Sequence, residues 1–409
     1  MNEYRTMFRN PRFRTLWFAR LISNLGNGMS PTALSFGILA LHGATARDLG
    51  LVLTAQAVPL VLLLPLGGVI ADRLPRAVVI STTDMILGGF VVTSGTLFLT
   101  GHATVTNIAA INAVSGVLHA LWWPAFPGLV PAVLGDRELQ RGNALIAIAS
   151  NAGLISGAGV AGALIALFGP GIAIVIDGVT FLVAGWLVFT FRDVARAQPS
   201  GRSMVYDLNH GWQTFISFRW LWVVVAVFGF IIGCIRAAFD VGGPVLMKLR
   251  FDGPTSWALI QTAQAVGFLA GAMLAARIRP ARPLVYCLLV SAVIPAYMVA
   301  MSVPLPVPVL AGFAFGLGVC FEQWGVMWGT AMQTHIPREA LSRASAFDAM
   351  GSLLFAPVGL AVAGPIIAAF GLHALFVGAA GVTIALLLLP LLEPEVRNLR
   401  WKDPEPEPA

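Results

Sequence analysis

The sequence GGVIADRLPR, residues 67–76, joins two apolar runs that are each long enough to cross a membrane. Its two glycines end the first run, and one acid and two arginines mark a very short aqueous turn before the chain becomes apolar again. The second half contains a similar turn, GAMLAARIRPAR, at residues 271–282. Because Arg73 and Arg277 lie about half the chain apart, the sequence predicts two related halves, each with a basic turn on the same side of a membrane.

The composition indicates a membrane protein. Of the 409 residues, 57% are hydrophobic and only 11% are charged, and the mean hydropathy is +0.83. A soluble chain of this size needs more polar surface, whereas a bilayer favours an apolar exterior and requires backbone amides to be bonded within helices. The formal charge of +6 does not indicate a nucleic-acid partner, because the basic residues lie in short loops between apolar runs. We therefore predict an all-α integral membrane protein surrounded by lipid.

Twelve apolar runs have the length of a membrane span, which takes roughly 20 residues. In the first half they cover residues 14–41, 49–71, 77–99, 106–131, 143–167 and 171–191. In the second half they cover residues 219–246, 255–277, 283–303, 307–331, 344–369 and 371–392. The first run lacks the cleavage site of a signal peptide, so we expect it to remain as a span.

These runs divide the chain into two six-span halves, residues 1–191 and 219–392. The segment 192–218 between them is polar, and its later apolar residues recur at near-helical spacing. We therefore predict a central loop that carries a helix lying in the membrane interface. Residues 393–409 are rich in proline and glutamate, which predicts a disordered tail. A second repeat supports a duplication: TAQAV occurs at residues 54–58 and again at 262–266.

The distribution of basic residues predicts the orientation. Among the 25 lysines and arginines, Arg47, Lys248 and Arg250 fall on one side of the predicted topology, and Arg20 and Arg236 fall inside spans. All the others fall on the side that carries both termini and the central loop. Since cytoplasmic loops are enriched in basic residues, we expect both termini to be cytoplasmic in a cell membrane, inner or plasma, and the number of spans to be even.

Twelve spans, a central loop and the 67–76 turn together resemble the major facilitator superfamily, whose signature lies between spans 2 and 3. The 271–282 turn looks like the degraded second copy of that signature. Within the superfamily, residues 129–145 and 335–352 look like the bacterial macrolide-efflux and enterobactin-exporter branch. The resemblance implies two pseudo-symmetric six-helix bundles around a central cavity that opens alternately to each side and is lined by spans 1, 4, 7 and 10. The chain departs from the branch at Asn27, where members often have an acid.

The resemblance also implies a cytoplasmic gate, in which the 67–76 turn latches against the start of span 11. A carboxylate near a helix N-terminus is favoured by about 0.3–1 kcal/mol, so ligand binding or protonation can break such a latch. The residues carried over to this gate are Gly68, Asp72, Arg73, Arg76, Arg277, Arg343 and Asp348.

Charged side chains inside spans usually line a cavity or form pairs, because a charge at mid-bilayer costs about 2.5–3.5 kcal/mol. Arg236 and Asp240 lie four residues apart on span 7 and therefore share one helix face. One interpretation is an internal ion pair that makes the helix insertable. The other is that the pair faces the cavity and binds substrate, with Asp240 contributing to proton coupling.

Glu322 on span 10 is our main candidate for proton coupling, because no basic residue lies within a turn on its own helix. The alternative is a structural pair with Arg236 across the cavity. Asp84 and Asp177 lie near a span end or beside glycines, which favours a hydrogen-bonding role. His119 is either a core residue with its hydrogen bonds satisfied or a proton carrier.

Aromatic residues accompany these charges on spans 4 and 10 and predict a greasy pocket suited to large amphipathic ligands. The alternative is that the tryptophans are interfacial anchors. The predicted substrate-binding residues are Arg20, Asn24, Asn27, His119, Trp123, Arg236, Asp240, Glu322, Trp324 and Trp328.

The leading hypothesis is a proton-coupled antiporter that exports hydrophobic or amphipathic small molecules, such as a drug or a siderophore-like product. One alternative is uptake of a nutrient or lipid by the same fold, and another is a membrane enzyme or receptor that does not transport. We find no nucleotide-binding loop, metal-ligand cluster or nucleophile with a base in register, so we expect no cofactor, no metal and no enzyme activity. We expect the chain to act as a monomer, with a small-molecule substrate and protons as its ligands.

Overall fold

The computed structural model describes residues 7–134, 138–192 and 204–401. The helices of the first half coincide with the predicted spans to within a few residues. They are α2 (Pro11–Ala40), α3 (Ala46–Arg73), α4 (Arg76–Leu99), α5 (Val105–Ala125), α7 (Leu139–Phe168) and α8 (Pro170–Phe189). The short helices η1 (Phe126–Gly128) and α6 (Leu129–Val133) extend α5 and complete the fourth predicted span.

The second half has more breaks within its spans. Span 7 consists of α10 (Arg219–Ile235), the π-helical η4 (Arg236–Gly242) and α11 (Gly243–Arg250), and span 9 consists of α13 (Pro283–Val290) and α14 (Val293–Ser302). Spans 8 and 10 are α12 (Pro254–Ala275) and α15 (Val307–His335). The chain continues with α16 (Arg338–Leu353), α17 (Ala356–Leu388), η5 (Leu389–Leu392) and α18 (Pro394–Asn398).

Ten segments of the described chain are long and apolar enough to cross a membrane. The last of them, Ala344–Leu392, has 49 residues and is divided by Gly371, whose φ of 84° no ordinary helix residue adopts. Helix α2 is not among the ten, because Arg20, Asn24 and Asn27 make it more polar, yet its 30 residues pack against α7 and α8. With α2 and the division at Gly371, the described helices fit the twelve predicted spans.

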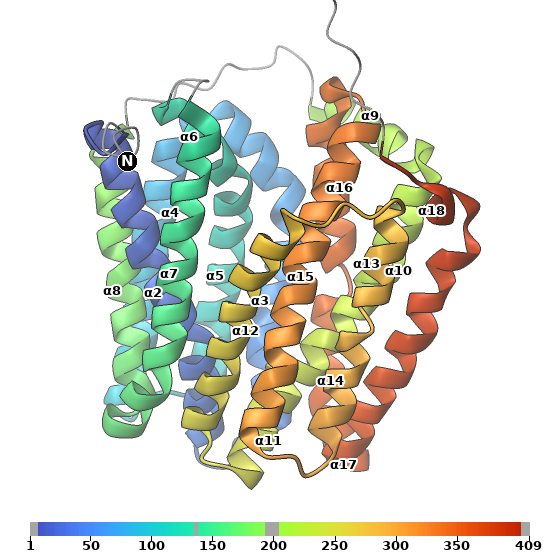
Figure 1. The fold of residues 1–409 in the computed structure, drawn as a ribbon. Coiled ribbons are helices and arrows are strands. Elements are labelled where there is room, and N and C mark those ends of the chain that lie inside the picture. The colour runs from blue at the N-terminus through green and yellow to red at the C-terminus, as the bar shows by residue number, and fades with distance from the viewer. Residues whose placement is uncertain (1–6, 135–137, 193–203, 402–409) are drawn as a thin grey trace, which may run out of the picture.

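The helices form two bundles that stand side by side, with the blue-to-green helices in one and most of the yellow-to-red helices in the other (Figure 1). Close packing at glycines is similar in the two. In the first bundle, Gly116 of α5 lies against the backbone carbonyl of Gln56 on α3. In the second, Gly318 of α15 lies against the carbonyl of Gln264 on α12. The repeated TAQAV segments therefore pack in the same way in both halves.

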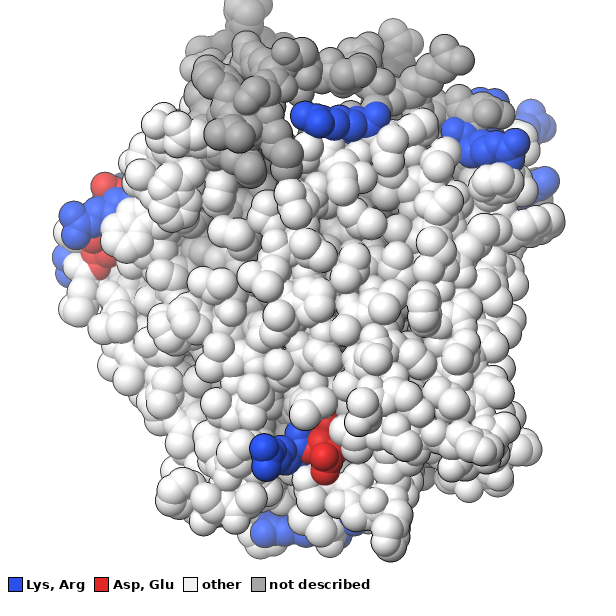
Figure 2. Space-filling view, turned by 180° about the vertical axis from the view of Figure 1, so that it is seen from behind, with Lys and Arg blue, Asp and Glu red and all other residues white. Residues whose placement is uncertain are grey.

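The two ends of the molecule differ in what they carry. The beginning of the chain, α9 (Met204–Ser217) and α18 lie at one end, which we call the terminal end (Figure 1). The opposite end carries the loops at residues 41–45, 100–104, 251–253 and 303–306, and we call it the short-loop end. From behind, charged side chains lie toward these two ends, and a broad uncharged band separates them (Figure 2). This band has the character of a surface that faces lipid.

The central segment 192–218 does contain the predicted helix, α9, while residues 193–203 lie outside the described part of the chain. Trp212 and Phe215 of α9 pack against Phe347 of α16, with ring centroids 5.5 and 6.2 Å away. Helix α9 is therefore held against the second bundle.

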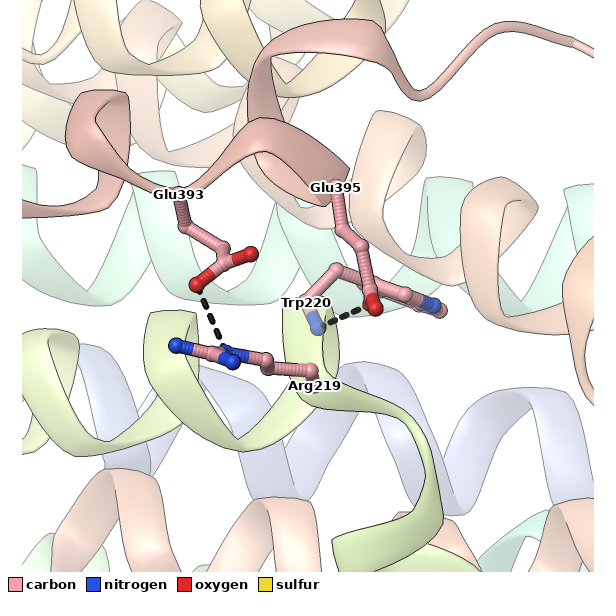
Figure 3. A network of polar contacts seen from close by, with 4 residues as sticks. All are labelled: Arg219, Trp220, Glu393 and Glu395. Atoms are coloured by element: carbon pink, nitrogen blue, oxygen red, sulfur yellow. Dashed lines mark hydrogen bonds and ion pairs between the residues drawn. The ribbon is translucent and has the colours of Figure 1, made fainter.

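The first part of the predicted disordered tail folds back onto the second bundle. Glu393 forms a 2.7 Å ion pair with Arg219, and the Glu395 carboxylate accepts a 3.1 Å hydrogen bond from the backbone N–H of Trp220 (Figure 3). Further along, the Trp401 indole donates to the carbonyl of Pro280 at 2.8 Å. Residues 393–401 thus form a strap across the terminal end, and residues 402–409 lie outside the described part.

Candidate functional site

A cavity of about 570 Å³ lies between the two bundles. Its volume is in the range of small-molecule sites, roughly 300–1,000 Å³. Apolar and aromatic side chains alternate around it with polar ones. The polar and charged lining residues are Asn27, Ser30, Ser35, Gln56, Asn112, Ser115, His119, Asp177, Arg236, Asp240, Gln261 and Gln264.

The bundles make close contacts at the short-loop end of this cavity. A Cβ at Gly50 of α3 would overlap the carbonyl oxygen of Leu360 on α17, and a Cβ at Gly364 of α17 would overlap the backbone of Arg47. On the other flank, Gly162 of α7 lies against α12, where its Cβ would come within 2.8 Å of the Ala258 Cβ. Backbones can approach this closely only where side chains are absent.

A hydrophobic cluster and a hydrogen bond complete this seal. The cluster combines Ile38, Leu39 and Leu49 of the first bundle with Val241 and Leu360 of the second, among other residues. The Lys248 ammonium donates to the carbonyl of Leu39 in the last turn of α2, where the helix dipole favours a cation. At the terminal end, by contrast, the described hydrophobic cluster around Phe13 and Leu129 contains first-bundle residues alone.

The Arg236–Asp240 pair lies in the cavity wall, within π-helical η4. The Arg236 Nη1 lies 2.7 Å from the Asp240 Oδ2. The side chains keep 46% and 34% of their surface exposed, so both can contact a ligand in the cavity. The π-helical turn widens the helix locally, a distortion common at functional sites. The two residues thus pair with each other and also line the cavity, and their role in substrate binding and proton coupling stays a prediction.

Among the other predicted substrate-binding residues, Asn27 and His119 also line the cavity. The His119 Nδ1 lies 2.8 Å from the carbonyl of Ser115, so this nitrogen carries the proton. The Asn24 amide donates to the carbonyl of Arg20 on its own helix and does not reach the cavity lining.

Arg20 lies elsewhere, in a small pocket of about 10 Å³ inside the first bundle that Asp84 also lines. Its guanidinium lies 5.1 Å from the ring centroid of Trp122 and 4.2 Å from that of Phe126. These are cation–π distances. Arg20 is therefore held among α2, α4 and the end of α5 and not in the central cavity.

Glu322, Trp324 and Trp328 are not among the residues that line the cavity. The Cβ of Glu322 faces Gly271 of α12, within the contact between α12 and α15. Its neighbour Phe321 does line the cavity, and one residue rotates a helix face by about 100°.

The aromatic residues of spans 4 and 10 have other partners. Trp324 stacks on Phe228 at 3.8 Å between ring centroids, and the Trp328 indole donates to Asp348 at 3.1 Å. Trp123 is 48% exposed and is not among the residues that line the cavity. Of the predicted substrate-binding residues, Asn27, His119, Arg236 and Asp240 come together in the cavity wall.

The cavity contains polar residues that the sequence analysis did not select, above all Gln56, Gln264, Asn112 and Asp177. Each is a polar residue within a long apolar run. Gln56 and Gln264 also occupy the same position in the two TAQAV repeats, which was a usable signal.

For the predicted gate, the side chains of Asp72 and Arg343 lie outside the described residues. Asp348 accepts hydrogen bonds from Trp328 and, at 3.4 Å, from Ser352, all within the second bundle. Gly68 has open space around its Cβ position, whereas Gly67 is the tightly packed glycine, set against the carbonyl of Ala120 on α5. The latch between the bundles stays a prediction.

Two helical bundles that enclose a partly polar cavity within a lipid-facing exterior define a multi-span membrane transporter. Residues 16–347 match the sequence profile of the Major Facilitator Superfamily. The chain belongs to this superfamily, and the resemblance drawn from the 67–76 turn is confirmed.

Its relatives include multidrug efflux pumps. The pump Tap of Mycolicibacterium fortuitum is 24% identical over 400 residues, covering 93% of this chain and 95% of that protein. The pump Tap of Mycobacterium tuberculosis is 26% identical over 406 residues, covering 96% and 95%.

Solved structures share the fold. The nucleoside transporter NupG superposes with a TM-score of 0.71 at 12% identity, covering 93% of this chain and 98% of that one. A bacterial homologue of the human lysosomal transporter Spinster, in its inward-facing and occupied conformation, gives a TM-score of 0.69 at 13% identity over 97% and 99%.

Proposed function

We propose that this protein exports hydrophobic or amphipathic small molecules from the cytoplasm by alternating access, in exchange for protons. The observation that carries the proposal is the central cavity, which lies between the bundles and has a mixed apolar and polar wall. A few polar groups in a largely apolar pocket suit amphipathic ligands, which bury their apolar part and satisfy one or two hydrogen bonds. The relatives named as multidrug efflux pumps support export.

The proposed orientation places the terminal end in the cytoplasm. Basic residues are concentrated in the loops of that end, as the predicted topology requires. With this orientation, the seal at Gly50, Gly162 and Gly364 lies on the outer side, and the cavity faces the cytoplasm. This is the state that an exporter presents to its substrate.

The proton-coupling residues of the proposal are Glu322 and Asp240, as the sequence indicates. Glu322 is partly buried in the α12–α15 contact, next to the cavity-lining Phe321. Because α12 also contacts α7 of the first bundle, protonation of Glu322 can influence the inter-bundle contact without touching substrate.

The test is transport into proteoliposomes under an imposed pH difference, with the lipophilic cationic dye ethidium as the probe. We expect wild-type protein to accumulate the dye against its gradient and the Glu322→Gln protein to lose about tenfold or more of this accumulation. Accumulation by Glu322→Gln at the wild-type level would show that the coupling assignment is wrong. Vesicles of defined orientation then separate export from uptake, since export predicts dye movement from the terminal end to the short-loop end.

A further inference from the structure

Asp177 is a buried acid in the cavity wall that the proposed coupling does not use. It lies in the middle of α8, lines the cavity and keeps only 1% of its surface exposed. Its Oδ1 is buried and has no hydrogen-bond partner among the described residues. An unpaired carboxylate in such surroundings is unfavourable in its charged form, whereas the protonated acid is tolerated.

The neighbouring helix α2 is shaped around this carboxyl. A Cβ at Gly26 would overlap both the Asp177 Oδ1 and the Thr180 hydroxyl, so a glycine is needed for α2 and α8 to meet here. One turn further, Ser30 is a polar neighbour of the Asp177 carboxyl and lines the cavity together with Asn27. The groups that surround the acid on this side are uncharged.

The charged groups on the helices packed against α8 lie at other levels or have other contacts. On α4, Asp84 faces Gly185, about two turns beyond Asp177 along α8. On α2, Arg20 precedes Gly26 by nearly two turns and lies over aromatic rings. On α7, the charged residue is Arg141, near the start of the helix.

Across the cavity, the titratable groups that face Asp177 from the other elements also have partners. Arg236 is paired with Asp240, and the His119 Nδ1 is bonded to the Ser115 carbonyl. Asp177 is thus a carboxyl in the wall of the central cavity to which the described residues supply no cation.

We propose that Asp177 is a proton-binding residue of the transport cycle, held protonated between α2 and α8 and able to exchange its proton with the cavity. Because it faces the cavity, the proton passes to water on whichever side the cavity is open. A cationic substrate in the cavity near the carboxyl promotes this release, since it stabilises the carboxylate. The inference rests on the proposed export function and deepens it by placing a second proton site in the first bundle, separate from Glu322.

The transport test compares wild type, Asp177→Asn and Asp177→Glu in proteoliposomes with ethidium. We expect Asp177→Asn to lose about tenfold or more of the pH-driven accumulation while downhill movement of the dye continues, and Asp177→Glu to regain most of the accumulation. Accumulation by Asp177→Asn at the wild-type level would overturn the proposal.

An infrared measurement on purified protein tests the same residue without transport. We expect a protonated-carboxyl band that is lost in Asp177→Asn, and a shift of this band in Ser30→Ala, which removes only one hydroxyl. If Asp177→Asn does not fold, the Ser30→Ala measurement still tests the proposal. A band in Ser30→Ala at the same position as in wild type contradicts it. If wild type moves no dye in any gradient, the export function fails, while the infrared result still decides the state of Asp177.

Discussion

At the residue scale, the central feature is the Arg236–Asp240 pair in the π-helical turn of span 7. The two side chains pair with each other, yet each keeps more than a third of its surface exposed. A pair of this kind can insert into the membrane as a neutral unit and still offer either charge to a ligand. It therefore explains how a strongly apolar bundle keeps charged groups at the proposed binding site.

This pair gives a prediction about stability and binding. Asp240→Asn alone leaves Arg236 uncompensated, and we expect a loss of about 1–2 kcal/mol in stability, reduced from the fully buried case by solvent in the cavity. The double variant Arg236→Gln/Asp240→Asn removes both charges, and we expect it to regain that stability but to bind ethidium about tenfold more weakly than wild type. Thermal unfolding and dye binding in detergent measure the two effects. If the double variant binds ethidium as tightly as wild type, the pair is not part of the substrate site.

The candidate site was only partly predictable from the sequence, because the sequence does not show which side chains of a helix face the cavity. Polar residues inside apolar runs are visible in a sequence, and Arg236, Asp240, Asn27 and His119 were found in this way. What the sequence does not give is the rotation of each helix about its axis. A rotation of one residue places Phe321 in the cavity and Glu322 in the α12–α15 contact.

At the element scale, the strap formed by residues 393–401 connects separate helices of the second bundle. Helix α10 has no capping side chain of its own at Phe218, and the Glu395 carboxylate takes that place by accepting from the N–H of Trp220. A carboxylate at this position also interacts favourably with the helix dipole. The strap thus caps the N-terminus of a helix that is remote from it in the sequence.

We expect Glu395→Ala to lower the stability of the protein by about 1 kcal/mol, the usual contribution of an N-cap. The matched control is Arg397→Ala, on the same short helix, where the side chain is exposed. Thermal unfolding in detergent measures both. Equal effects of the two variants would mean that the loss comes from α18 itself and not from the cap on α10.

Elements were the most predictable level of this protein. Apolar length decides where a helix crosses the membrane, so the spans were placed to within a few residues. Breaks inside spans were not predicted, because the π-helical turn at Arg236–Gly242 and the break between α13 and α14 depend on packing with neighbouring helices. The strap was missed for a similar reason: a Pro- and Glu-rich segment predicts disorder, and its partners Trp220 and Pro280 are remote in sequence.

At the scale of the whole molecule, two bundles meet through backbone contacts at glycines near the short-loop end. Contacts of this kind stabilise one arrangement of the bundles but can be broken, because few interdigitated side chains have to separate when the bundles move apart. The packing of Gly116 on Gln56 in the first bundle is repeated by that of Gly318 on Gln264 in the second, so the two bundles are packed in a similar way. In the proposed alternating access, one bundle moves against the other around the cavity.

Distances between spin labels at the two ends of the molecule test this claim most directly. One pair replaces Leu74 of the first bundle and Arg277 of the second, at the terminal end. The other pair replaces His102 of the first bundle and Phe370 of the second, at the short-loop end. All four positions are exposed. Gly50→Ala overpacks the seal by about 1–3 kcal/mol and so shifts the populations roughly 5- to 150-fold. Gly89→Ala, in α4 of the same bundle and with open space around it, is the control.

We predict that Gly50→Ala lengthens the short-loop distance and shortens the terminal distance, while Gly89→Ala leaves both at their wild-type values. Two distances that stay constant, or that change in the same direction, would contradict a cavity that opens to one side at a time.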